Sequence, residues 1–139
     1  MINAKNVNLY LDATYLKTAD EAGVSEIVNK EHVVSVIEEA VKSSYSCVMI
    51  RPKYVSLAKK IIQSHNSNLK IGTVIDFPLG NADTLTKVEQ SKKALIEGAY
   101  DIDYVCDYNA FKRGSFYKFD KDILEGTKIV LENNGLVKW

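Results

Sequence analysis

The chain has 139 residues, 46% of them hydrophobic and 26% charged, which is the ordinary composition of one globular domain. Lys plus Arg equals Asp plus Glu at 18 each, so the basic excess typical of proteins that bind nucleic acid or anionic membranes is missing. No apolar run approaches the roughly 18 residues of a membrane span, and the first residues have no apolar signal-peptide core. We therefore expect a single cytoplasmic domain, residues 1–139, that binds neither nucleic acid nor membrane.

The first half of the chain alternates predicted strands and helices. Residues 7–12 form a strand with apolar alternation that ends in Asp12, and the polar stretch 13–30 is a loop with room for a short helix. Residues 31–43 place their apolar side chains at helical spacing, and 46–50 (SCVMI) form an apolar strand covered on both faces. Pro52 suits the first turn of a helix that continues to residue 64.

The second half continues the alternation. Residues 70–76 form a strand, and Asp83 caps a helix that ends at Gly98 and turns Leu85, Val88, Leu95 and Ile96 inward. Residues 101–106 form the next strand, 108–114 a loop and 119–132 a helix. A last strand begins at residue 136.

This alternation predicts repeated βαβ units, which build a parallel sheet with helices packed outside it. Two architectures use the pattern. A doubly wound sheet of five strands suits 139 residues, whereas a (β/α)8 barrel normally needs about 250, so the chain would be its N-terminal half.

Charged residues near the strand ends favour the barrel. Asp12, Arg51, Asp76 and Asp107 come at or just after predicted strand ends, where both architectures bind ligands. Asp103 and Lys138 lie within successive strands, where a buried charge is costly unless a partner neutralises it. If Asp103 and Lys138 lined a barrel mouth, the charge of each would partly neutralise that of the other. The alternative is that Asp103 is a solvated edge position and Lys138 a frayed terminal residue.

Cys47 and Cys106 are the only cysteines, and both lie in apolar, strand-like stretches. We expect them to be reduced core residues rather than a disulfide. No cluster of Cys and His has metal-ligand spacing, so no metal site of that kind is expected.

Four phrases carry a family resemblance. Residues 11–17 (LDATYLK), 48–55 (VMIRPKYV), 73–80 (TVIDFPLG) and 97–105 (EGAYDIDYV) resemble deoxyribose-phosphate aldolases in order and approximate spacing. The resemblance runs from about residue 9 to 138 and corresponds to the first four and a half units of that family's TIM barrel.

The resemblance implies a cytoplasmic class I aldolase of deoxyribonucleotide catabolism. It would cleave 2-deoxy-D-ribose 5-phosphate, a sugar phosphate, to glyceraldehyde 3-phosphate and acetaldehyde through a lysine Schiff base, without a cofactor. By motif match, Asp103 is the proton-relay aspartate, and Asp12 and Lys138 belong to the charged network beside the reactive lysine. Thr14, Met49 and Arg51 fall at substrate-side positions. Met49 and Arg51 depart from the family's frequent Cys and Asn, and Arg51 is equally compatible with a phosphate contact and a surface role.

The family's Schiff-base lysine, on the sixth strand, matches no lysine here. We therefore expect the chain alone to be inactive. Half a barrel also leaves its first and last strands as open edges, so we expect the chain to self-associate through exposed sheet edges, as a homo-oligomer or by exchange of elements. Two alternatives stay open: another enzyme on the same barrel, and a non-enzymatic flavodoxin-like module that binds a phosphorylated ligand or a protein. A compact monomer in light scattering would instead favour a chain that closes up as a flavodoxin-like sheet. A reading frame that continues past residue 139 would argue against the non-enzymatic module.

Overall fold

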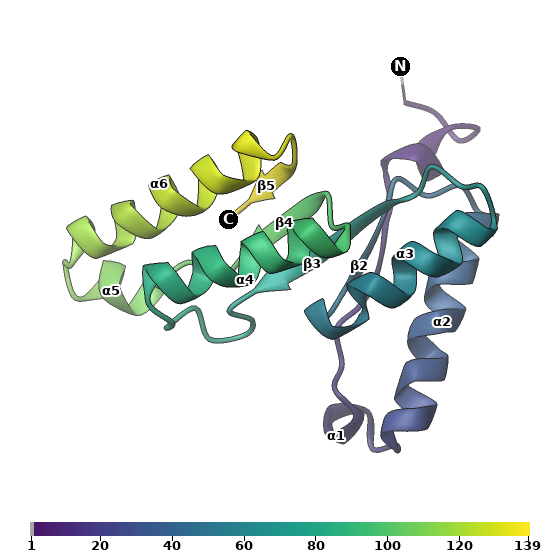
Figure 1. Cartoon of the computed structure of the whole chain (residues 1–139), viewed down its shortest axis with the longest axis horizontal. Helices are drawn as coiled ribbons and strands as arrows, with labels where there is room; N and C mark the ends of the chain where they lie inside the picture. Colours follow the sequence, from purple (N-terminus) through teal and green to yellow (C-terminus); the bar gives the residue numbers. More distant parts are fainter. Residues whose placement is uncertain (1) are drawn as a thin grey trace. The chain divides into compact units, whose positions relative to one another are not determined.

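The structure, a computed structural model, describes residues 2–139 and is an α/β fold (Figure 1). Five parallel strands follow one another along the sheet in the order β1-β2-β3-β4-β5. A doubly wound sheet would instead reverse its strand order at a switch point. The strictly sequential order is that of a barrel segment, which confirms the predicted fold class.

The chain forms two compact units, Met1–Gly72 and Thr73–Trp139, and the boundary falls inside β3 (Lys70–Ile75). That the whole chain is one domain stays a prediction.

The first unit pairs β1 (Asp12–Tyr15) with β2 (Cys47–Ile50). Its helices are α1 (Ala19–Ala22), α2 (Glu26–Lys42) and α3 (Val55–Ser64), the last preceded by the 3-10 turn η2 (Pro52–Tyr54). A capping box between Thr18 and Glu21 begins α1. The core of the unit consists of side chains that are completely buried: Val33, Ile37, Ala40, Val48, Ile50, Val55 and Ala58.

The predicted strand at residues 7–12 is wrong. Val7–Tyr10 is instead a 3-10 turn, η1, whose residues are not buried, and β1 begins only at Asp12. The apolar alternation of this stretch covers no core, because Leu9 and Tyr10 are both more than half exposed. Asp12 is therefore the first residue of its strand, at the end opposite to the one expected.

The second unit pairs β4 (Asp101–Tyr104) with β5 (Leu136–Lys138). Its helices are α4 (Thr84–Glu97), α5 (Tyr108–Lys112) and α6 (Phe116–Glu132). The side chain of Asp83 accepts from the Thr86 N–H, and Gly98 ends α4 in a left-handed conformation, as predicted.

Two expectations in this unit are wrong. The stretch predicted as a loop at 108–114 contains α5, which begins where Asp107 accepts from the Ala110 N–H. Leu85 and Ile96 point outward from α4, with exposures of 66% and 81%. The inward positions of α4 are Lys87, Ser91 and Ala94, so its buried stripe is partly polar.

The ring of Trp139 closes the packing between β4, β5 and α6. It stacks on Tyr104 with ring centroids 4.3 Å apart, and its indole N–H donates to the Thr127 hydroxyl over 3.0 Å. A side chain at Gly126 would meet Trp139 at 2.8 Å, so the absence of one allows the ring to lie there. Burial raises the pKa of Tyr104, and the hydrogen bond with Ser91 partly opposes that rise.

Of the helices among residues 2–139, none has the length and apolar character to span a membrane.

Candidate functional site

β4 and β5 form a charged face in the second unit. Asp101 and Asp103 point to the same side of β4 because side chains alternate along a strand. The strand register places Asp103 beside Lys138 and Asp101 beside Leu136. The structure therefore brings the two predicted residues Asp103 and Lys138 to neighbouring positions.

The ion pair on this face differs from the expected one. Lys138 Nζ lies 2.9 Å from Oδ2 of Asp101, not of its register partner Asp103. Asp101 is 3% exposed, whereas Asp103 is half-buried. Mutual neutralisation was predicted for Asp103 and Lys138, and the cation instead pairs with the carboxylate two residues earlier.

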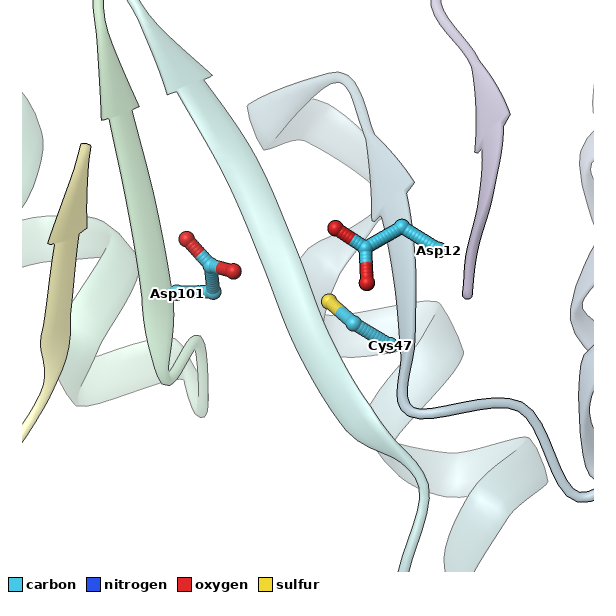
Figure 2. Close-up of side chains that lie close together, drawn as sticks. All are labelled: Asp12, Cys47 and Asp101. Carbon is cyan, nitrogen blue, oxygen red and sulfur yellow. The ribbon is translucent and has the colours of Figure 1, made fainter. Parts of the chain in front are cut away.

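The other predicted residues belong to the first unit. The register pairs Asp12 with Cys47 and Thr14 with Met49, so all four point to one side of β1 and β2. Asp12 and Thr14 are exposed, whereas Cys47 and Met49 are buried. Figure 2 labels Asp12 and Cys47 on these strands, together with Asp101 on β4. Neither cysteine forms a disulfide, as expected; Cys47 is buried and Cys106 half-buried.

Gly72 explains how Met49 is held. A Cβ on Gly72 would lie 2.5 Å from Met49 Cε and 2.9 Å from Cys47 Sγ. The two sulfur side chains therefore occupy the volume that any other residue would need at this position of β3. Met49 is thereby packed against the backbone rather than extended into solvent.

Arg51 follows β2 and is tied to the loop after β1. Its Nε donates to the Leu16 carbonyl over 2.6 Å, and Nη2 lies 3.4 Å from Oε2 of Glu21. Hydrogen bonds from Thr18 hold the pKa of the Glu21 carboxyl below its usual value, and Arg51 adds to that shift. These contacts give Arg51 a structural role, while its proposed contact with a phosphate stays a prediction.

Sequence reasoning missed the buried ionic network around Lys87. Lys87 on α4 is 1% exposed, and its Nζ lies 2.9 Å from Asp122 on α6 and 3.6 Å from Asp76 after β3. The ammonium also donates to the carbonyls of Gly80 and Val105. Asp122 accepts from the Thr84 hydroxyl as well, so both charges of the central pair are solvated by protein groups.

A signal for this network was present in the sequence. Lys87 is in helical register with Ser91 and Ala94, the positions that face inward. A search for apolar side chains at helical spacing does not include a lysine among the buried positions. Burial of Lys87 is tolerable only because acidic partners compensate its charge.

A second ion pair connects the loop after β4 to α6. Lys118 Nζ lies 2.7 Å from Oδ2 of Asp107, whose other oxygen caps α5 at Ala110. The Lys118 ammonium lowers the pKa of the Asp107 carboxyl, burial opposes the shift, and the Ala110 N–H reinforces it. The same hydrogen bond raises the pKa of Lys118.

This pair predicts a pH dependence of stability. The lowered pKa of Asp107 contributes stability above the unfolded value of about 3.9, which is lost as the pH falls through the folded value. The raised pKa of Lys118 contributes stability below the unfolded value of about 10.4, which is lost as the pH rises through the folded value. We expect Lys118→Met to flatten both limbs of the curve of unfolding free energy against pH.

The measurement is urea unfolding between pH 2 and 5 and again above pH 9, over windows set by these shifts. Lys128→Met, at an exposed position of the same helix, serves as the matched control. Parallel curves for Lys118→Met and the wild type would contradict the prediction.

No family model matches the chain. A deoxyribose-phosphate aldolase from Thermococcus kodakarensis is 31% identical over 137 residues, which are 99% of this chain and 58% of that protein. One from Bacillus cytotoxicus is 37% identical over 120 residues, covering 86% of this chain and 49% of that protein.

The chain is homologous to deoxyribose-phosphate aldolases. It spans about half the length of the curated relatives it matches, which is consistent with their N-terminal portion.

Solved structures of deoxyribose-phosphate aldolases share the fold. A putative deoxyribose-phosphate aldolase from Coccidioides immitis superposes with a TM-score of 0.83 at 22% identity, over 98% of this chain and 49% of that one. A deoxyribose phosphate aldolase from Aeropyrum pernix, described as having a unique tetrameric structure, gives 0.77 at 20% identity, over 96% and 51%. At these identities the likeness is one of fold.

Proposed function

We propose that a polypeptide containing this chain is a deoxyribose-phosphate aldolase. It cleaves 2-deoxy-D-ribose 5-phosphate to glyceraldehyde 3-phosphate and acetaldehyde through a lysine Schiff base, whose protonated imine accepts the electrons of the breaking carbon–carbon bond. The observation that carries the proposal is the β4–β5 register, which sets Asp103 beside Lys138 in a chain homologous to proteins of that name.

Each predicted residue has a proposed role in this reaction. Asp103 relays protons to and from the enamine carbon, directly or through water. Lys138 and Asp12 belong to the charged network near the reactive amine, where a nearby cation disfavours the ammonium form of another lysine. Thr14, Met49 and Arg51 lie on the substrate side. The reaction requires no metal.

The lysine that forms the Schiff base is proposed to lie outside these 139 residues, so the chain alone does not catalyse the reaction. Incubation with deoxyribose 5-phosphate and borohydride would reduce any imine to a stable secondary amine. We expect intact-mass spectrometry to show no adduct on this chain. A lysine adduct above the level of a denatured control would contradict this expectation.

A positive arm tests the aldolase itself. A protein whose sequence continues past Trp139 is expected to form the borohydride adduct and to release acetaldehyde from deoxyribose 5-phosphate. If it forms neither, the proposed function is wrong, whatever the behaviour of the 139-residue chain.

We further propose that the chain self-associates through β1 and β5, the strands at the two ends of the sheet order. An end strand presents unpaired backbone groups that another chain can bind. The tetrameric description of the Aeropyrum pernix structure supports an oligomer. Light scattering is expected to give a mass above the 15.6 kDa of one chain, and a mass of 15.6 kDa would contradict it.

A further inference from the structure

Two carboxylates and one ammonium share the charged face of β4 and β5. Within Thr73–Trp139, the charged side chains that β4 and β5 direct to this face are Asp101, Asp103 and Lys138. Ile102 and Tyr104 alternate with the two aspartates and point to the other face, where Tyr104 contacts Ser91 and Trp139. On these two strands, a single ammonium therefore neutralises one of two carboxylates.

The cation is not placed where the register alone would put it. The Cα of Lys138 stands beside Asp103, yet its Nζ lies 2.9 Å from the carboxylate of Asp101, two residues earlier on β4. Among residues 2–139, no Lys, Arg or His nitrogen lies within 4.0 Å of the Asp103 carboxylate. The side chain of Lys138 thus leans back along the sheet to reach the more buried acid.

Burial explains the preference. The side chain of Asp101 is 4% exposed, and an ionised carboxylate at that depth is costly unless a cation compensates it. Asp103 is half-buried and keeps access to water, so it needs a counter-ion less. The ammonium goes to the site with the larger desolvation penalty.

This division has a chemical consequence. A carboxylate held in an ion pair is a weak base, because a nearby cation favours its charged form. A proton relay works best when its affinity for protons is close to the working pH. The relay aspartate therefore benefits when the neighbouring cation is occupied elsewhere.

We propose that Asp101 is a positioning residue that holds the Lys138 ammonium away from Asp103 and so leaves the Asp103 carboxylate available to exchange protons. The catalytic meaning of this arrangement rests on the proposed aldolase function. The arrangement itself is a property of the 139-residue chain and is testable without activity.

The test is an NMR titration of the lysine side chains in uniformly labelled chain, following the Cε and Hε signals of Lys138, which the variant Lys138→Arg identifies by their loss. In Asp101→Asn we expect the midpoint of the Lys138 titration to fall by about one pH unit, because an opposite charge within about 4–6 Å is lost. In Asp103→Asn the midpoint falls less than in Asp101→Asn, because that carboxylate is not within 4.0 Å of the ammonium. Asp101→Glu, which keeps the charge, restores most of the midpoint.

Asp120→Asn, on the exposed face of α6, is the control for a general change in charge. A larger fall in Asp103→Asn than in Asp101→Asn would overturn the proposal, as would equal falls in both. If Asp101→Asn does not fold, Asp103→Asn still decides: a fall of about one unit or more overturns the proposal, and a smaller fall supports it. Neither outcome depends on borohydride trapping, so a failure here is distinguishable from a failure of the aldolase assignment.

Discussion

Lys87→Met is expected to lower the free energy of unfolding by about 3–5 kcal/mol, because it leaves the buried carboxylate of Asp122 without its cation. The Lys87 side chain is 1% exposed and that of Asp122 is 0% exposed, so water cannot replace the lost ammonium. Gly80 and Val105 also lose a hydrogen-bond donor to their carbonyls. Domains are commonly stable by only about 5–15 kcal/mol, so the variant stands near the limit of folding.

Urea unfolding followed by fluorescence measures this effect. The matched control is Lys93→Met on the same helix, whose side chain is 77% exposed and whose Nζ lies 3.9 Å from Oε1 of Glu97. An exposed pair of this kind contributes about 0–1 kcal/mol. The double variant Lys87→Met/Asp122→Leu removes both charges and should recover part of the loss, since an apolar pair can replace a buried ionic one. A Lys87→Met variant as stable as Lys93→Met would show that the network contributes little.

Gly80→Ala is expected to destabilise the chain by about 2–4 kcal/mol, because the alanine would have a strained backbone conformation and its Cβ would clash with a neighbour. A second glycine, Gly114, allows the two costs to be measured separately. Gly80 has a φ of +67°, in the left-handed region, and a Cβ there would lie 2.3 Å from the carbonyl oxygen of Cys106. Gly114 has a φ of +73° but nothing within 4 Å of its hypothetical Cβ.

Gly114→Ala therefore measures the backbone cost alone, about 1–2 kcal/mol for a left-handed L-residue. The additional loss in Gly80→Ala measures the close approach of the turn after β3 to the end of β4. The same urea series compares both variants with the wild type. Equal losses of unfolding free energy in the two variants would mean that the turn moves away from Cys106 at no cost. That result would contradict the prediction.

Much of the fold follows from local sequence. The N-cap at Asp83 and the helix-ending Gly98 were readable because each satisfies a backbone requirement that few residue types meet. The apolar run at Cys47–Ile50 was readable because a strand covered on both faces needs no alternation. The strand around Asp103 was predicted two residues too long, since hydrophobic Val105 and Cys106 continue past the end of β4.

The errors arose where tertiary contacts decide. Residues 7–12 have the alternation of a strand, but the β1–β2 register begins at Asp12, which leaves that alternation without a partner. Lys87 was not recognised as buried because Asp76 and Asp122, its acidic partners, are 11 and 35 residues away in sequence. The pairing of Lys138 with Asp101 rather than Asp103 depends on relative depth, which strand periodicity does not contain.

Trp139 gives the second unit its own optical signal. It is the single tryptophan of the chain, and it lies against Tyr104 with its indole N–H bound to Thr127. Its emission therefore reports whether β4, β5 and α6 are assembled, and residues 1–72 contribute no tryptophan to that emission. Unlabelled chain is thus sufficient to time the assembly of Thr73–Trp139 in a stopped-flow instrument, separately from events elsewhere in the polypeptide.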